Sequence, residues 1–401
     1  MKAGIRRKAR SFGRFFSVLL LFAMAAQTEM AQADAPVQNP IWVGVWRGTI
    51  GIAAVQVCLQ HEDYGDLGAY YYLRHLGIIS IGKLGAQPNW TEAPLSDHPD
   101  KGPMWHFASV SSGRLQGTWS DGAKKILPFE LTRVAMAKAG TDDSNDTPCG
   151  NEAFSLPRFT KPVITSKAAF LKGVPYTRIL ADPGKQFSDS ETETFQLPGT
   201  TPAIRRVNAE LYKNVPTGPD NANYFTCSMA ALGQNGLDGD ASSTITPLIL
   251  SANWLVLQDN ESDDCGGAHP NSDTSYETWD LRKGVKLNLY DWFTKSALIQ
   301  TVNDPGTKDQ YVTVTFTAPF MKLIQGAFPQ DEVDCKEAIE DADTWDPRLT
   351  ATGIAFTPEL PHAAQGCADD ADIPLAKLLP YLTETGRSEL ALFISEIRHS
   401  K

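Results

Sequence analysis

The sequence predicts an all-β N-terminal domain, a small barrel or a sandwich meander, followed by an α+β domain with an antiparallel sheet. In the first part of the chain, short stretches rich in aromatic and β-branched residues alternate with glycine-containing turns, which is typical of β-strands. Beyond a polar stretch near residue 140, helical patterns alternate with hairpin patterns. With 401 residues, 42% of them hydrophobic and 21% charged, the chain is too apolar for a disordered protein and long enough for two domains.

Residues 1–33 are expected to be a secretory signal peptide. Six basic residues precede an apolar run over residues 15–26, and Ala31-Gln32-Ala33 is a small-x-small cleavage site. An uncleaved membrane anchor is the alternative, but the run is shorter than the roughly 20 apolar residues of a bilayer span. Cleavage removes those six charges and Glu29, so the net charge changes from −11 to −11 − 5 = −16. We therefore expect a periplasmic or secreted protein with no membrane span after cleavage and no nucleic-acid partner.

The cysteines point to the same compartment. All six lie in the predicted mature chain: Cys58, Cys149, Cys227, Cys265, Cys335 and Cys367. An even number in an exported chain predicts three disulfides. The sequence allows many pairings, and we expect nearest neighbours to pair, because this keeps one bridge in or at the edge of each predicted segment.

Residues 38–135 are predicted to form the β-rich domain. Its strands are expected near residues 55–59, 70–73, 78–81, 105–107, 115–119 and 127–131. This domain is rich in aromatic residues, namely Tyr70, Tyr71 and Tyr72 and the tryptophans at 42, 46, 90, 105 and 119. These side chains are interpreted as core, with a binding face for sugar or a partner chain as the alternative.

Residues 136–153 are predicted to be a linker, residues 154–385 the α+β domain and residues 386–401 a C-terminal helix or tail. Ile204, Val207 and Leu211 share one helical face. Strands are expected over 224–231, 245–258, 311–317 and 352–357, with a hairpin of 276–281 and 285–289 turning at Gly284. A helix capped by Asp291 is expected to run towards residue 299, and another to cover 375–382.

One stretch resembles a known family. Gly266-Gly267-Ala268-His269-Pro270-Asn271 precedes a strand that ends in Asp280-Leu281-Arg282-Lys283-Gly284 and a second that ends near Asp291-Trp292-Phe293. In this pattern the chain resembles the extracellular domain of RsiV-type anti-sigma factors, which also accompanies the catalytic domain of PdaC-type peptidoglycan deacetylases. The resemblance covers roughly residues 155–385 and implies an α+β domain with an antiparallel sheet.

The resemblance also implies a partner, because the RsiV domain binds lysozyme. The sequence shows neither a cytoplasmic sigma-binding segment nor a deacetylase domain, so we expect neither of those activities. The candidate binding residues are Gly266, Gly267, His269 and Asn271. For each, a role in a tight turn is the favoured alternative, since glycine permits close backbone approach and His and Asn can cap backbone groups.

Catalytic motifs are scarce, and G-x-S-x-G, H-E-x-x-H and P-loop patterns are absent. Ser80-Ile81-Gly82-Lys83 matches S-x-x-K without its partner motifs, and His61-Glu62-Asp63 reads as solvated surface. Acidic clusters near residues 142–146, 259–264 and 369–370 do not follow a calcium-loop pattern, so no metal or cofactor is expected.

These patterns favour an exported, non-catalytic binding protein of the cell envelope that recognises lysozyme or another basic envelope protein. A mature charge of −16 would accelerate such an encounter. The first alternative is a cell-wall-active hydrolase whose carboxylates are assembled by the fold, since paired acids need no local motif. The second is a structural envelope protein.

Overall fold

The computed structural model describes residues 40–399 apart from 86–88, 137–145, 309, 330–334 and 343, and of His362 and His399 only the backbone. The expected signal peptide and half of the predicted linker, residues 137–145, thus lie outside the described residues. No helix in the described ranges combines the length and apolar character that a membrane crossing requires.

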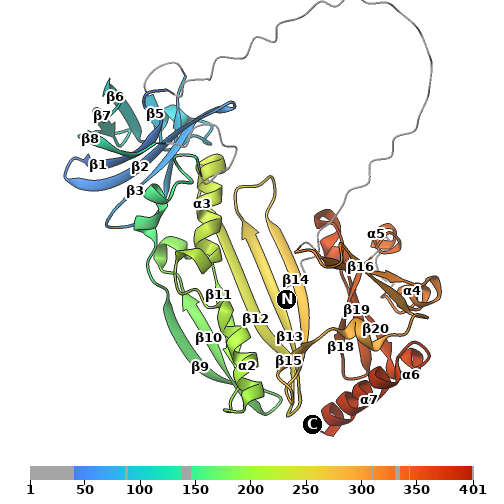
Figure 1. The fold of residues 1–401 in the computed structure, drawn as a ribbon. Helices are drawn as coiled ribbons and strands as arrows, with labels where there is room; N and C mark the ends of the chain where they lie inside the picture. Colours follow the sequence, from blue (N-terminus) through green and yellow to red (C-terminus); the bar gives the residue numbers. More distant parts are fainter. Residues whose placement is uncertain are drawn as a thin grey trace, which may run out of the picture.

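The N-terminal part is a closed antiparallel barrel of eight strands (Figure 1). Each strand pairs with the next, and β1 closes the barrel by pairing with β8. The strands are β1 (Gly44–Ile50), β2 (Ala53–Glu62), β3 (Gly65–Tyr72), β4 (Ile79–Lys83), β5 (Asn89–Thr91), β6 (Met104–Val110), β7 (Arg114–Ser120) and β8 (Ile126–Ala135). The expected all-β domain is confirmed as a barrel and not a sandwich. Buried aromatic and aliphatic side chains fill it, among them Trp46, Trp90, Trp105 and Phe107.

A seven-stranded sheet follows, in the order β15-β14-β13-β12-β11-β10-β9 (Figure 1). Its strands are β9 (Val163–Leu171), β10 (Val174–Asp182), β11 (Thr192–Gln196), β12 (Asp240–Leu250), β13 (Trp254–Asp264), β14 (Asn271–Asp280) and β15 (Val285–Leu287). All neighbours are antiparallel except β11 and β12, which are parallel. The connection between these two carries α2 (Pro202–Leu211) and α3 (Asn223–Asn235). The expected α+β class is confirmed.

The sheet is buried on both faces around β13. Leu255 and Leu257 point to the face covered by α2, where Val207 and Leu211 share their core. Trp254 and Val256 point to the other face and join the core of the C-terminal part. This alternation follows from the two-residue period of a strand, and it makes β13 the element that holds the two cores together.

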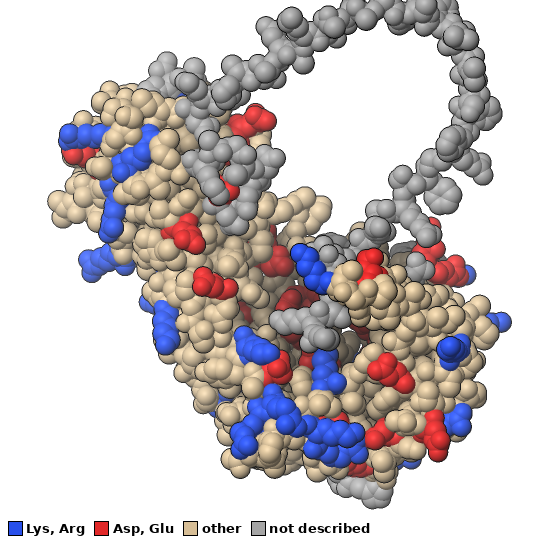
Figure 2. All heavy atoms as spheres, in the orientation of Figure 1, with Lys and Arg blue, Asp and Glu red and all other residues tan. Residues whose placement is uncertain are grey.

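The C-terminal part combines two small sheets with four helices. It comprises β16 (Leu298–Asn303) paired with β17 (Tyr311–Phe316), the sheet of β18 (Trp345–Leu349), β19 (Gly353–Pro358) and β20 (Ala371–Pro374), and the helices α4 (Ala318–Gln325), α5 (Lys336–Glu340), α6 (Leu375–Leu378) and α7 (Glu384–His399). Figure 2 shows a hollow between the seven-stranded sheet and this part, with acidic side chains on its walls.

Three local expectations were wrong. Residues 224–231 lie in α3, not in a strand. Eight residues of α3 are buried, so its apolar run lacks the one-sided period that identifies a surface helix. Residues 245–258 are two strands, β12 and β13, separated by a turn in which Ser251 N donates to Trp254 O.

The third error concerns Asp291. It lies inside a 3₁₀ turn, Leu289–Trp292, which is capped by Asn288. No longer helix follows, because Phe293 is extended and pairs with Leu382. The hairpin at Gly284, with φ of +64°, and the strands near 311–317 and 352–357 are as expected. The helix expected over 375–382 is shorter, Leu375–Leu378.

Three disulfides join Cys58 to Cys149, Cys227 to Cys265 and Cys335 to Cys367. These pairs are the nearest neighbours in the sequence. Disulfides of this kind are typical of exported proteins.

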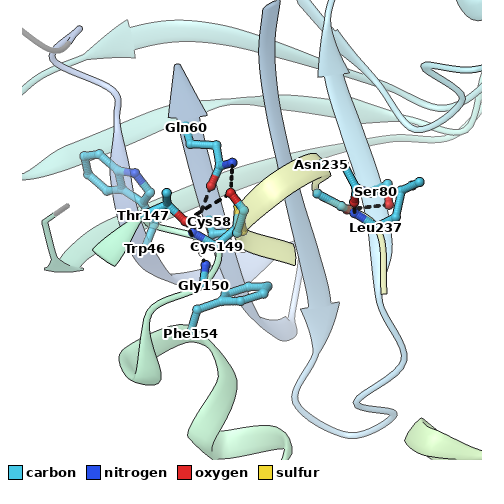
Figure 3. The surroundings of a disulfide bond; sticks show 12 residues. Trp46, Cys58, Gln60, Ser80, Thr147, Cys149, Gly150, Phe154, Asn235 and Leu237 are labelled. Carbon is cyan, nitrogen blue, oxygen red and sulfur yellow. Dashed lines mark hydrogen bonds between the residues drawn. A yellow bond between two sulfur atoms is a disulfide. The ribbon is translucent and has the colours of Figure 1, made fainter. Parts of the chain in front are cut away.

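The first disulfide lies where the barrel meets the rest of the molecule (Figure 3). Gln60 of β2 donates to Gly233 O of α3 at 2.9 Å and accepts from Cys149 N at 3.2 Å. The described part of the predicted linker is therefore packed against the barrel wall, with Cys149 fully buried.

Arg158 is the second contact point between the two parts. It is fully buried, donates to Leu76 O of a barrel loop at 2.9 Å, and pairs with Asp238 after α3. Its guanidinium also lies 4.9 Å from the ring centroid of Phe187. One side chain thus joins the barrel, α3 and the start of the sheet domain.

Candidate functional site

The four candidate binding residues lie in and beside one turn. Residues 265–270 connect β13 to β14. The last residue pair of the two strands before this turn is Asp263 with Asn271. The disulfide between Cys265 and Cys227 ties this turn to α3. The sequence motif therefore marks a hairpin end that is fixed to a helix.

Gly266 has a steric role in this turn. Its φ is +88°, and an added Cβ would lie 2.7 Å from Ala231 Cα in α3. Gly267 is different, because an added Cβ would find its nearest neighbour at 3.8 Å. Only the first glycine is needed for close approach of the turn to the helix.

His269 and Asn271 occupy the exposed side of the turn. The Asn271 Nδ2 donates to Asp263 Oδ1 at 3.2 Å, so this amide bridges the ends of β13 and β14. The structure thus brings Gly266, Gly267, His269 and Asn271 together in one turn. That they bind a ligand stays a prediction.

Directly after Asn271, the chain enters a cleft that the sequence did not reveal. The cleft has a volume of about 640 Å³ and lies between β13 and β14 on one side and β18, β19 and the following 3₁₀ segment (His362–Cys367) on the other. It is lined by Gln258, Ser272, Asp273, Thr274, Tyr276, Asp346, Thr357, Pro358, Glu359, Leu360, Gln365, Gly366 and Ala368. We call it the acidic cleft, because three of these residues are acidic and none is basic.

Asp346 is the most enclosed of the three carboxyl groups. Burial raises its pKa, and Asp273 acts in the same direction, while a hydrogen bond from Tyr290 and the charge of Lys286 oppose the shift. Tyr290 Oη lies 3.2 Å from Asp346 Oδ1. The carboxyl group is therefore held in a fixed orientation beside a second acid.

The basic side chains nearest to the cleft are already paired. Arg348 forms an ion pair with Asp370 and lies over the ring of Tyr276, 5.0 Å from its centroid. Lys286 pairs with Glu277 at 2.5 Å. The lining itself holds three acidic residues and no basic residue, so the cleft favours a cationic group.

Asp273 shares one face of these two strands with further acidic side chains. Glu261 lies directly across from Asp273 in the β13–β14 ladder, with Asp259 and Glu277 further along. Burial, together with Glu261, Glu277 and Asp273, raises the pKa of Asp259 to about 6. Its Oδ1 is buried and has no hydrogen-bond partner among the described residues.

Where the acidic clusters noted in the sequence are described, they do not assemble a metal site. Cys227, Asp263 and Cys265 come together, but the two sulfurs are joined in a disulfide. Asp259 and Asp264 lie on opposite faces of β13. Asp370 is paired with Arg348, and residues 142–145 lie outside the described ranges.

The other sequence candidates take structural roles in the barrel. The Ser80 hydroxyl donates to Gly236 O at 2.7 Å, and Lys83 pairs with Asp66 at 2.7 Å. Asp66 also contacts His61 Nδ1 at 2.5 Å. Most of the aromatic residues are core, as expected, but Trp42, Tyr72 and Trp119 are only partly buried.

No local signal could have identified the acidic cleft. Asp273, Asp346 and Glu359 come from β14, β18 and the segment after β19, which are far apart in the chain. Only the packing of the C-terminal part on the sheet brings them to one cavity. The resemblance over residues 265–293 includes Ser272, Asp273, Thr274 and Tyr276 of the cleft lining but did not indicate a cleft.

Comparisons with known proteins give two solved structures. The chain is similar to a DUF3298 family protein from Pseudomonas aeruginosa PAO1, with 14% identity and a TM-score of 0.36, over 56% of this chain and 96% of that one. A DUF3298 family member from Bacteroides fragilis NCTC 9343 gives 15% identity and a TM-score of 0.36, over 59% of this chain and 96% of that one. No protein-family model matches the chain, and no curated protein matches it significantly.

Proposed function

We propose that the protein is an exported binding protein that takes a cationic group of a basic protein partner into the acidic cleft. The observation that carries this proposal is the lining of the cleft, which includes Asp273, Asp346 and Glu359 and no basic residue. A lysine or arginine side chain of a partner would bring a positive charge to this lining. The three disulfides support an exported protein.

Lysozyme is the first partner to test, because the turn over residues 265–270 resembles the lysozyme-binding family and adjoins the cleft at Ser272. Lysozymes are often strongly basic, and the protein has a net charge of −11 before any cleavage. Opposite charges of this size raise association rates and favour complex formation at low salt.

The experiment is lysozyme turnover of cell walls with increasing amounts of the purified protein. We expect stoichiometric inhibition that is lost in the double variant Asp273→Asn, Glu359→Gln. The matched control is Asp97→Asn, Asp100→Asn, which removes two exposed charges from a barrel loop. Equal inhibition by the cleft variant would reject the cleft as the binding site, and no inhibition by the unaltered protein would reject lysozyme as the partner.

A second candidate function rests on Asp346. A half-buried carboxyl group with a raised pKa beside Asp273 is an arrangement that general acid catalysis uses, as in hydrolases of cell-wall sugars. Incubation of the protein alone with peptidoglycan tests this candidate. Release of soluble fragments that Asp346→Asn abolishes would establish a hydrolase, and intact peptidoglycan would exclude this activity on that substrate.

A further inference from the structure

One end of the barrel holds a carboxylate that the proposed function does not use. Glu92 follows β5, and its Oε1 accepts hydrogen bonds from three aromatic side chains of β3, β6 and β7. The donors are Tyr70 Oη at 2.7 Å, Trp105 Nε1 at 3.3 Å and Trp119 Nε1 at 2.5 Å. Three donors from three strands fix the position of this carboxylate.

The charge of Glu92 is not balanced by these contacts. All three donors are neutral, and no described lysine, arginine or histidine forms an ion pair with Glu92. Its hydrogen bonds to described residues all use Oε1, which leaves Oε2 available. An acceptor for two indoles and a phenol does not need a charge, since a glutamine oxygen would serve as well.

The surroundings of Glu92 are partly open and apolar. Tyr70 and Trp105 are buried, whereas Glu92, Tyr72 and Trp119 are only partly buried. Two aliphatic residues, Ile79 and Leu127, pair across the ladder with Tyr70 and Trp119 and are also partly buried. Below them the barrel is filled by side chains, so a ligand would lie across this end and not inside it.

We propose that this end of the barrel binds a primary alkylammonium group. The ammonium would donate to Glu92 Oε2 and contact the partly exposed rings of Tyr72 and Trp119, which favour a cation at their faces. The alkyl chain would lie on Ile79 and Leu127. The same group occurs in free amines and in lysine side chains, so both are sources of the ligand.

The test uses the full chain and observes the indole N–H signals of Trp105 and Trp119 by ¹⁵N NMR. The probes are n-hexylammonium, its uncharged counterpart n-hexanol, and the N-acetyl methylamide of lysine. We expect saturable shifts of both signals with an ammonium probe and at least tenfold weaker binding of hexanol. Tighter binding of the lysine derivative would identify a protein segment as the source, and tighter binding of hexylammonium a free amine.

The variant Glu92→Gln keeps an acceptor for the three donors but removes the charge. We expect it to bind the ammonium probes at least tenfold more weakly, while Glu130→Gln, on an exposed carboxylate of β8, binds as the unaltered protein does. The cleft variant Asp273→Asn, Glu359→Gln should leave these shifts unchanged, which separates this site from the acidic cleft. Equal binding of hexanol and hexylammonium, or no shift of either indole signal, would overturn the proposal even if Glu92→Gln failed to fold.

Discussion

At the scale of single residues, the acids of β13 and β14 are the feature that sets this protein apart from an ordinary antiparallel sheet. Like charges directly opposite each other destabilise a ladder, yet Glu261 faces Asp273 with Asp259 close by. Asp259 adds to this destabilisation, because one of its carboxylate oxygens is buried and has no hydrogen-bond partner among the described residues. This placement gives the sheet a negative potential and is expected to lower its stability.

This arrangement predicts that stability depends on pH through Asp259. Its pKa is raised to about 6 in the folded protein, so the folded state binds the proton more tightly than the unfolded state. Stability should therefore fall as pH rises from about 4 to above 6, and Asp259→Asn should remove that loss. At pH 8 we expect Asp259→Asn to be more stable by about 1–2 kcal/mol, a value reduced for partial exposure.

Urea unfolding at pH 4 and pH 8 measures this effect. The gain from Asp259→Asn should be much smaller at pH 4, where the folded carboxyl group is protonated and an unfolded aspartate, with a pKa of about 3.9, is only about half ionised. Asp97→Asn, on an exposed barrel loop, is the control and should change stability equally little at both pH values. An Asp259→Asn gain that is equal at pH 4 and pH 8 would show that ionisation is not its cause.

At the scale of elements, the β13–β14 hairpin connects every part of the candidate site. Its turn is tied to α3 by the disulfide of Cys265 with Cys227, and its side chains line the acidic cleft. The close approach of Gly266 to Ala231 shows that the turn and the helix form one packed unit.

The two glycines of the turn should therefore respond differently to substitution. We expect Gly266→Ala to destabilise the protein by about 2 kcal/mol, because its Cβ would clash with Ala231 and φ is positive. Gly267→Ala should change stability by no more than about 0.5 kcal/mol, since its surroundings are open. Thermal unfolding of the two variants checks the difference, and equal losses would mean that the contact with α3 is not the reason for the glycine.

Elements with a clear period or turn could be predicted from the sequence, and the others could not. Alternating aromatic and β-branched residues predicted the barrel strands, and Gly284 predicted the turn of its hairpin. Helix α3 was missed because it is buried on several sides. The acidic cleft and the carboxylate of Glu92 were missed for another reason, since each depends on side chains from strands that meet only in the folded chain.

At the scale of the whole molecule, the barrel is attached to the sheet domain by buried contacts and a disulfide. Cys149, Gln60 and Arg158 all link β-barrel residues to α3 or to the segment before β9. A shared core of Val45, Tyr71, Phe154 and Leu232 lies at the same place. We therefore expect the barrel and the sheet domain to move and unfold as one body.

Replacing Arg158 tests how strongly the barrel is attached to the sheet domain. Its removal leaves Asp238 without its partner and empties a buried position, so Arg158→Ala should lower the free energy of unfolding by about 3 kcal/mol. Arg114→Ala removes an exposed ion pair with Glu130 and should cost less than about 1 kcal/mol. Urea unfolding followed by tryptophan fluorescence compares the two, and a small effect of Arg158→Ala would show that Arg158 contributes little to the attachment of the barrel.

The most direct test of the binding proposal is the dissociation constant of the complex with hen lysozyme, measured by calorimetry at low and high salt. We expect one-to-one binding that weakens by about tenfold or more between roughly 30 mM and 300 mM salt. The variant Asp273→Asn, Glu359→Gln should weaken binding by a similar factor at low salt, whereas Asp97→Asn, Asp100→Asn should not. Binding that is insensitive to both salt and the cleft variant would contradict the central role of the acidic cleft.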